Sequence, residues 1–317
     1  KGNIQVENGS IYDFLHLALK NLGRGKINIY STVINSLTYG FNFLTKHNLK
    51  KVSKRNVEMH YDRGEDIYDW MLDKEHRQYS CAFFKDPSES LEQAQSNKLS
   101  LIAKKLHLQE GDRLLDIGCG WGGAGRYFAK EFGCEVHGIS LSSNQINYCK
   151  NKAKESNLDN FLSYELCDYR NVKGKYKKIL NVGFYEHLSP KFYGVFFKKI
   201  NDLLTDDGIC LTHTIASVNK PSPTNPFISK YIFPGGKVPT TTQITKAIEG
   251  SGLIISGWES LIDMYNYTLD SWRKRFLQNA DLAKRKYGPE FVRLWDFYLS
   301  SCSAAFKYAD LLVYQIE

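Results

Sequence analysis

The sequence lacks the features that mark several large classes of proteins. No apolar run approaches the ~20 residues that a membrane-spanning helix needs, and we expect no secretory signal peptide ahead of the fold. Internal repeats and low-complexity segments are also missing, which excludes a repeat array. Basic residues are scattered and match no nucleic-acid-binding motif, so we expect no nucleic-acid partner.

Cysteine usage points in the same direction. The seven cysteines are odd in number and form no C-x-x-C pair. Scattered, unpaired thiols in an enzyme-sized chain are typical of a reducing cytosol rather than of a secreted disulfide scaffold. We therefore expect a cytoplasmic protein, and we expect no metal site.

The residues that are present indicate a globular protein with an anionic partner. The 317 residues are 42% hydrophobic and 14% aromatic, which excludes a disordered or collagen-like chain. Lys and Arg (42) exceed Asp and Glu (34), so the formal charge is +8. We expect an N-terminal helical region at residues 1–58 and one large domain at 59–317. The chain begins at Lys1 rather than Met, so we expect further residues before it.

Apolar residues at helical spacing predict two helices near the start, over 11–22 and 30–44, separated by Gly23-Arg24-Gly25. A basic stretch with four lysines (Lys46, Lys50, Lys51 and Lys54) and Arg55 follows over 46–55. Two interpretations remain open. The pair can be core-facing helices with a solvated charged end, or its basic end can bind anionic lipid headgroups.

From about residue 96 the pattern alternates between strands and helices. We predict strands at 113–117, 135–139, 161–165, 178–182 and 208–212, with helices following the first two, the second over 142–155. Two closing strands are predicted at 253–256 and 311–315. Such alternation predicts an α/β fold with a mostly parallel sheet covered by helices on both faces.

A glycine turn, Gly118-Cys119-Gly120-Trp121-Gly122, follows the first predicted strand. Glycines there let the backbone approach a nucleotide, although dinucleotide enzymes use a similar turn. Two details favour S-adenosylmethionine over a nicotinamide cofactor. A carboxylate, Asp116, precedes the first glycine, and the second strand ends in Ser140 with Gln145 beyond it, not in the acid that grips an NAD ribose.

Six ordered motifs resemble those of the cyclopropane-fatty-acid synthases and mycolic-acid methyltransferases, a lipid-modifying branch of the class I methyltransferases. The resemblance runs from about His60 to the C-terminus. Its motifs are His60-Tyr61-Asp62, Tyr79 to Phe84, Leu115 to Gly123, Gly183 to His187, Leu211 to Ile215 and Tyr231 to Pro234, followed by Thr268-Leu269 with Trp272 and by Cys302 with Ala304 to Phe306. It implies a Rossmann-like, seven-stranded, mostly parallel sheet, with an N-terminal helical region and a lid insertion.

The resemblance also implies which residues bind S-adenosylmethionine. They are Tyr79 and Ser80; Asp116, Gly118, Gly120, Trp121 and Gly122 of the turn; Ser140, Leu141 and Gln145; and Asp168 with Tyr169. Many relatives have Trp-Glu where this chain has Tyr169-Arg170. The Tyr ring keeps a stacking face for the adenine, whereas the resemblance assigns no contact to Arg170.

Cyclopropane formation from a cis double bond needs a dry site and a base. The alkene attacks the sulfonium methyl, and a proton must leave the new methyl group before the ring closes. Aromatic faces tolerate the transient positive charge, and Tyr185, Phe233, Tyr265 and Tyr267 are candidates. The resemblance implies a bound bicarbonate as base, held by Cys81, Glu186, His213, Tyr265 and the backbone of Ile215. Cys302 occupies a place regarded as catalytic in the family, or it is a buried helix residue.

The expected partners are unsaturated phospholipid acyl chains at an anionic membrane surface, which would place the protein at the inner face of the membrane. We expect a lid over 219–272 with Phe227, Tyr231, Ile232, Phe233 and Trp258. Basic clusters at 273–275 and 284–286 can contact headgroups or simply face solvent. The oligomeric state is left open, a homodimer included. Alternatives are a methyl- or hydroxyl-branch-forming enzyme, an amine methyltransferase on the same scaffold, a non-catalytic lipid-binding module, and a nicotinamide-dependent reductase.

Overall fold

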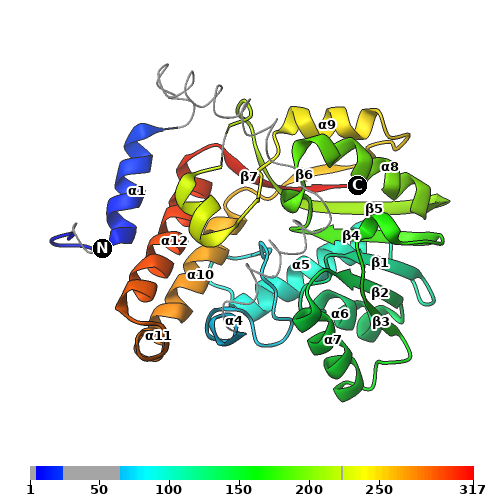
Figure 1. Ribbon diagram of the computed structural model, residues 1–317, viewed down its shortest axis with the longest axis horizontal. Helices are drawn as coiled ribbons and strands as arrows, with labels where there is room; N and C mark the ends of the chain where they lie inside the picture. Colours follow the sequence, from blue (N-terminus) through cyan, green and yellow to red (C-terminus); the bar gives the residue numbers. More distant parts are fainter. Residues whose placement is uncertain (1–4, 24–64, 223) are drawn as a thin grey trace.

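The computed structural model describes residues 5–23, 65–222 and 224–317. Within these ranges, seven strands form one sheet in the order β3-β2-β1-β4-β5-β7-β6 (Figure 1). The first five strands are mutually parallel, and β7 is antiparallel to both of its neighbours. The strands are β1 (Arg113–Ile117), β2 (Glu135–Ser140), β3 (Leu162–Leu166), β4 (Tyr176–Val182), β5 (Leu204–Ser217), β6 (Trp258–Ser260) and β7 (Leu311–Ile316). The predicted α/β class and mostly parallel sheet are confirmed.

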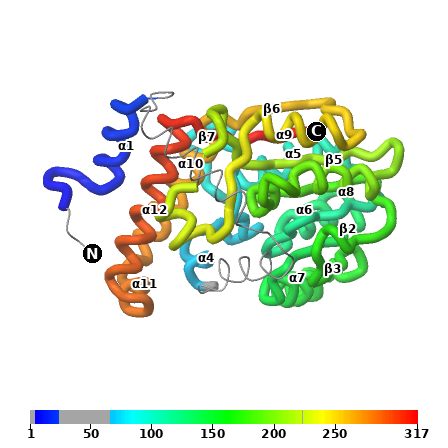
Figure 2. Tube along the Cα trace, turned by 45° about the horizontal axis from the view of Figure 1, so that its top comes forward, coloured from blue at the N-terminus to red at the C-terminus, as the bar shows by residue number. Residues whose placement is uncertain are grey.

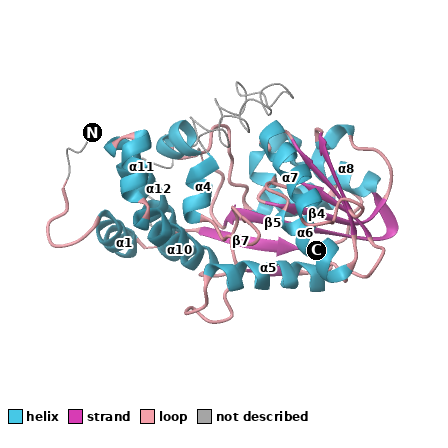
Figure 3. Cartoon of the chain, turned by 90° about the horizontal axis from the view of Figure 1, so that it is seen from below, coloured by secondary structure: helices cyan, strands magenta, loops and turns pink. Residues whose placement is uncertain are grey.

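Helices cover both faces of this sheet because successive strand residues point to opposite sides. Leu114 packs with the helices α5 (Leu91–Lys105), α6 (Gly123–Phe132) and α7 (Ser143–Glu155). Leu115 and Ile117 pack with α8 (Tyr193–Leu203) and α9 (Thr241–Glu249) on the other face. Figure 3 shows these helices on either side of the strands. The near-continuous apolar sequence of β1 is what a strand buried on both faces requires.

A third, helical layer packs beyond the end of the sheet. It contains α4 (Glu65–Met71), α10 (Met264–Gln278), α11 (Ala280–Tyr287) and α12 (Pro289–Tyr308), and its core includes the fully buried indoles of Trp272 and Trp295. The first helix, α1 (Ile11–Leu22), begins at a Ser10 capping box, ends before Gly23 and packs along α12 (Figure 2). No helix within the described ranges has the length and hydropathy of a bilayer span.

Short helical turns follow the strand ends and carry part of the site described below. They are η1 (Tyr169–Asn171), η2 (Tyr185–His187) and η3 (Pro190–Phe192), together with a π-helix, η4 (Ile228–Ile232).

Two predictions about the later part of the chain were wrong. Residues 253–256 form no strand, because the strand that completes the sheet edge is β6, which pairs with β7 two residues further on. The predicted lid over 219–272 is also too long. Helix α9 packs against α8, and Trp258 lies in β6 with its ring against Tyr314. Within 219–272, the described residues between β5 and α9 contain no strand and no α-helix.

Several predictions concern residues outside the described ranges. These are the second N-terminal helix over 30–44, the basic stretch over 46–55 and the motif His60-Tyr61-Asp62. The boundary between regions 1–58 and 59–317 also falls there and stays a prediction.

Candidate active site

The turn between β1 and α6 leaves its backbone open to a ligand. Gly118, Gly120 and Gly122 have φ values of +80°, +54° and +72°, a region that glycine adopts without strain. A Cβ on Gly120 would meet no atom within 4 Å, so this position borders open space. A Cβ on Gly123 would lie 1.8 Å from the carbonyl oxygen of His76, so the close approach of that segment also requires glycine.

A first cavity, here called the strand-end cavity, lies at the carboxyl ends of the parallel strands. It brings together seven of the predicted cofactor residues: Gly118, Gly120, Ser140, Leu141, Gln145, Asp168 and Tyr169. The Ser140 hydroxyl donates to Gln145 Oε1 at 2.8 Å, which fixes the amide. Gln145 Nε2 is buried and has no hydrogen-bond partner among the described residues. A buried donor without a partner costs free energy, and a bound ligand would satisfy it.

The other turn residues predicted to bind the cofactor lie behind this cavity rather than in its lining. Asp116 is buried at the end of β1, and burial raises the pKa of its carboxyl to about 7. Trp121 packs under the guanidinium of Arg77, 4.1 Å from the ring centroid. Gly122 is the N-cap of α6, and a Cβ there would lie 2.8 Å from Cys149 Sγ. These three residues shape the turn.

Sequence reasoning missed part of the strand-end cavity. Phe184, His187, Phe192 and Pro234 line it. Phe184, His187 and Pro234 lie within the family motifs but were assigned no part in binding the cofactor, and Phe192 lies outside these motifs. Arg170 also lines it and forms a bidentate ion pair with Asp168, with Nε–Oδ1 and Nη2–Oδ2 distances of 2.7 and 2.6 Å. The Asp-x-Arg spacing was visible in the sequence and could have indicated this pair.

A second cavity, here called the β5 cavity, has a volume of about 380 Å³ and adjoins the first at Gly183, which lines both. It brings together all six residues predicted to be catalytic: Cys81, Glu186, His213, Ile215, Tyr265 and Cys302. Tyr79 and Ser80, predicted to bind the cofactor, line this cavity instead. Its apolar lining includes Ile232, Phe233, Leu269, Phe306 and Val313.

The carboxylate in the lining of the β5 cavity is that of Glu186 on η2, and its pKa is shifted. Its Oε1 accepts the Ile215 backbone N–H at 2.6 Å, and its buried Oε2 has no partner among the described residues. Burial raises the pKa of Glu186 to about 7 although the Ile215 N–H opposes the shift. This side chain can therefore hold or release a proton near neutral pH. The Ile215 N–H, predicted to donate to bicarbonate, is already used by Glu186.

His213 on β5 is held by the strand beside it. It lies opposite Gln315 of β7, whose Nε2 donates to His213 Nδ1 at 3.2 Å. Burial holds the pKa of His213 well below its usual value, so the ring is neutral. With Nδ1 accepting, the proton of the neutral ring resides on Nε2. His213 is thus a neutral hydrogen-bond donor that lines the cavity.

The two cysteines and Tyr265 of the β5 cavity are neutral as well. Burial raises the pKa of the Cys81 thiol and of the Tyr265 phenol well above their usual values. Burial likewise raises the pKa of Cys302 to about 12, so its thiol stays protonated and is no thiolate nucleophile at neutral pH.

The aromatic candidates divide into two groups. Phe233 and Tyr265 line the β5 cavity, as do Tyr298 and Phe306, which sequence reasoning missed. Tyr185 instead stacks on Tyr193 within the core, and the ring of Tyr267 packs edge-on against Phe84. Neither Tyr185 nor Tyr267 belongs to the lining of the cavity.

Charges near the cavity differ from the sequence-based picture. Arg273 pairs with Asp296 at 2.6 Å, Arg275 with Glu92, and Lys286 with Asp66 at 2.8 Å, so half of the two predicted basic clusters forms intramolecular ion pairs. By contrast, Lys220 and Lys237 line the β5 cavity itself, with Ser222, Thr224 and Asn225 nearby in the lining. Apart from these lysines, the charged side chain in the lining is Glu186 at the buried end.

The fold and the glycine-lined strand-end cavity define a class I S-adenosylmethionine-dependent methyltransferase. A solved relative with this fold, mycolic acid cyclopropane synthase CmaA1 complexed with SAH and CTAB, superposes with a TM-score of 0.78 at 29% identity, covering 83% of this chain and 96% of that one. The sequence model of the mycolic acid cyclopropane synthetase family matches residues 48–316. The chain belongs to this family.

Curated relatives include enzymes with different products. The cyclopropane-fatty-acyl-phospholipid synthase of Escherichia coli K12 is 37% identical over 257 residues, which are 81% of this chain and 65% of that enzyme. Sphingolipid C9-methyltransferase A of Emericella nidulans is 33% identical over 275 residues, 83% of this chain and 53% of that enzyme. The chain therefore spans somewhat less than two thirds of the length of these relatives.

Proposed function

We propose that the protein is a cyclopropane-fatty-acyl-phospholipid synthase that uses S-adenosylmethionine. The observation that carries this proposal is the convergence of Glu186, His213 and Tyr265 in an apolar cavity that adjoins the glycine-lined cavity at Gly183. These residues come from η2, β5 and α10, which lie far apart in the sequence. The E. coli relative with this activity supports the assignment of substrate class.

The strand-end cavity fits the methyl donor. When bound, S-adenosylmethionine supplies an electrophilic methyl group. Gly118 and Gly120 would let its nucleoside approach the backbone, the unpartnered Gln145 Nε2 would donate a hydrogen bond, and the Tyr169 ring would offer an apolar face. The ionised form of Asp116 behind the turn, whose pKa burial raises to about 7, would favour a cationic ligand electrostatically.

The β5 cavity fits a bound bicarbonate in part. Such an ion would supply the base for the proton of the transferred methyl group. His213 Nε2–H and the Tyr265 phenol are neutral donors, and Glu186 Oε2 lacks a partner. Because the Ile215 N–H already bonds Glu186, we assign Ile215 to holding that carboxylate. Glu186 then accepts a proton at Oε2 and returns it to solvent between turnovers.

The apolar walls serve the chemistry by excluding water. A cationic intermediate on the acyl chain would be quenched by water, and buried Ile232, Leu269 and Val313 line the cavity. The rings of Phe233 and Tyr265 present π faces to positive charge.

The opening of the cavity supports an anionic lipid as substrate. Lys220, Ser222 and Asn225 are exposed lining residues, whereas the apolar lining is buried. A phospholipid could place its phosphate against Lys220 and Lys237 and its acyl chain against the apolar walls. We therefore propose attachment to an anionic membrane surface, at the inner face in the cell.

Lipid analysis tests this proposal. Purified protein is incubated with S-adenosylmethionine and vesicles of unsaturated phosphatidylglycerol, and the acyl chains are analysed by mass spectrometry. We expect each product chain to gain one CH2 and lose its double bond. Vesicles left unchanged, by a protein that binds SAH, would contradict the proposal.

A methyl-branched product is a second candidate. The chain is similar to sphingolipid C9-methyltransferase A, whose name indicates methyl transfer to a carbon atom of a lipid, and this similarity favours the second candidate. A methyl branch has the same gain of one CH2, so fragmentation of the product chain separates the two. Fragments with a cyclopropane ring at the position of the former double bond support ring formation. Fragments of a methyl-branched chain that keeps a double bond support the alternative.

A further inference from the structure

A buried polar network holds the segment that forms one wall of the β5 cavity. Lys98 on α5 has no exposed surface, and its Nζ donates to Ser80 Oγ at 3.0 Å and to Gln78 Oε1. One helical turn earlier, Gln95 Nε2 donates to the Ser80 carbonyl oxygen at 3.0 Å. Helix α5 thus fixes Ser80 through both its side chain and its backbone.

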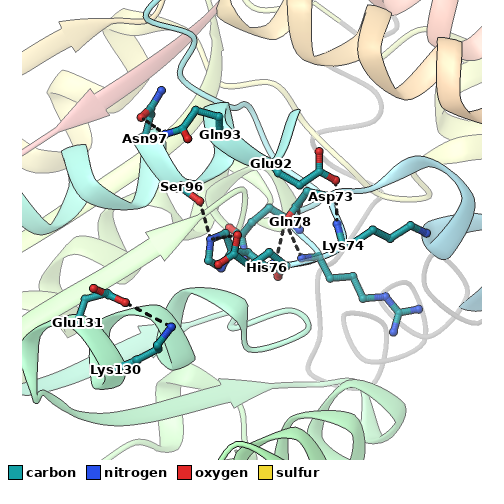
Figure 4. Close-up of polar contacts among 12 residues, drawn as sticks. Asp73, Lys74, His76, Gln78, Glu92, Gln93, Ser96, Asn97, Lys130 and Glu131 are labelled. Carbon is teal, nitrogen blue, oxygen red and sulfur yellow. Dashed lines mark hydrogen bonds and ion pairs between the residues drawn. The ribbon is translucent and has the colours of Figure 1, made fainter. Parts of the chain in front are cut away.

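The same segment is held from its other end by Asp73. The carboxylate accepts backbone N–H bonds from His76 at 2.6 Å, Arg77 at 3.0 Å and Gln78 at 2.7 Å, and Figure 4 shows Asp73, His76 and Gln78 gathered there. The His76 carbonyl lies against Gly123, at the start of the helix that follows the glycine turn. The segment 73–81 therefore links α5, the glycine turn and the cavity wall.

Lys98 also places a positive charge between these parts. Its charge opposes the burial-driven rise in the pKa of Asp116 and lowers the pKa of His213 further, so its field reaches both cavities. Burial lowers the pKa of Lys98 to about 8, which leaves it mostly protonated at neutral pH, and the carboxyl groups of Asp73 and Asp116 favour its charge.

Stability alone gives no reason for a lysine here. A buried charge pays a desolvation penalty, and replacing a whole buried ion pair by apolar side chains of similar size is often neutral or stabilising. The groups that contact Lys98 Nζ are polar, whereas Leu99 and Ile102 on the same helix belong to the apolar core.

We propose that Lys98 is a positioning residue for the methyl donor, acting through Ser80. It orients the Ser80 hydroxyl in the wall of the β5 cavity, and its charge favours the ionised form of Asp116 behind the glycine turn. This inference rests on the proposed function, since it takes the donor bound in the strand-end cavity to reach Ser80 where the β5 cavity adjoins at Gly183.

The test compares Lys98→Met with Lys104→Met, a matched change on the exposed side of the same helix. SAH binding is measured by calorimetry, and thermal unfolding is measured in parallel. We expect Lys98→Met to lower the Tm, because it leaves buried polar partners uncompensated, and to weaken SAH binding at least 10-fold at a temperature where the variant is folded, with a KM for S-adenosylmethionine that rises more than kcat falls. Lys104→Met should match the wild type.

The outcomes separate a positioning role from a structural one. SAH binding by Lys98→Met within twofold of the wild type would overturn the proposal. If that variant does not fold, Lys98→Gln, which keeps a donor for Ser80 but no charge, is measured in its place with weaker binding again expected. Failure of both to fold would assign Lys98 to stability and overturn the proposal. A wild type that does not bind SAH would instead refute the proposed function.

Discussion

The two cavities that meet at Gly183 are built in different ways. The strand-end cavity takes its predicted residues from loops at the carboxyl ends of β1, β2 and β3, which are neighbours in the sheet. The β5 cavity takes its residues from the segment before α5, from η2, β5, α10 and α12. Parallel topology brings together the predicted residues of the first cavity, whereas packing of the helical layer against the sheet forms the second.

The cavities also differ in how their polar groups are paired. In the strand-end cavity Ser140 bonds Gln145 and Asp168 pairs with Arg170. In the β5 cavity Glu186 Oε2 has no partner among the described residues, and its carboxyl pKa is displaced to about 7. Hydrogen-bonded and ion-paired side chains hold a fixed shape for binding. A carboxylate with a raised pKa and an oxygen without a partner is suited to proton transfer. The comparison predicts that mutations in the two cavities affect different steps.

The largest expected effect is on turnover. Glu186→Gln should lower kcat by a factor on the order of 10² or more, because it removes positioned proton transfer. SAH affinity should stay within about threefold, since positioned proton transfer contributes to kcat rather than to donor binding. Steady-state kinetics and calorimetry measure the two quantities, with Glu165→Gln, an exposed glutamate on β3, as the control. If Glu186→Gln turns over as fast as the wild type, the β5 cavity is not the site of proton transfer and the proposed contrast between the cavities is wrong.

A second prediction concerns stability. The pKa of Glu186 is raised in the folded protein from 4.5 to about 7, so its stabilising contribution is complete below pH 4.5 and is lost as the pH rises through 7. Glu186→Gln lacks this titration. The free energy of unfolding of the variant minus that of the wild type should therefore rise by about 2 kcal/mol between pH 5 and pH 8. Urea denaturation at both pH values measures this difference. A difference that is the same at pH 5 and pH 8 would show that the pKa of Glu186 is not raised in the folded protein.

A third prediction addresses the strand-end cavity. Gly120→Ala should weaken SAH binding about 10-fold or more, because the new methyl group projects into open space at the cavity. Gly111→Ala is a matched control, since Gly111 also has a positive φ and an open Cβ position but lies in a remote turn. Both changes carry similar backbone strain. If the two variants bind SAH equally well, the cavity is not the donor site.

The smallest expected effect is at the opening of the β5 cavity. Lys220→Gln and Lys237→Gln should each raise the KM for phosphatidylglycerol vesicles about fivefold, since one lysine near an anionic surface contributes about 1 kcal/mol. The KM for S-adenosylmethionine should not change. Lys230→Gln, on the same segment but outside the lining, serves as the control. A fivefold effect that persists at high salt would exclude an electrostatic contact.

Part of the fold and site could be predicted because the signals are local. The strand β1, the turn from Gly118 to Gly122 and the helix α7 with its Ser142 N-cap follow from side-chain periodicity, backbone freedom and capping within a few residues. The short edge strand β6 was misplaced because its half-buried residues carry a weak pattern, and pairing with β7 fixes its position.

What the sequence by itself determined is the order of strands and helices, the glycine turn and the identity of the chemical groups. Tertiary structure decided which groups are free to act: the Ile215 N–H bonds Glu186, and Arg275 pairs with Glu92, 183 positions away. Burial then set the pKa of Glu186. The physical reason is that dihedral preferences and periodicity act between neighbours along the chain, whereas desolvation and ion pairing depend on which distant segments pack together.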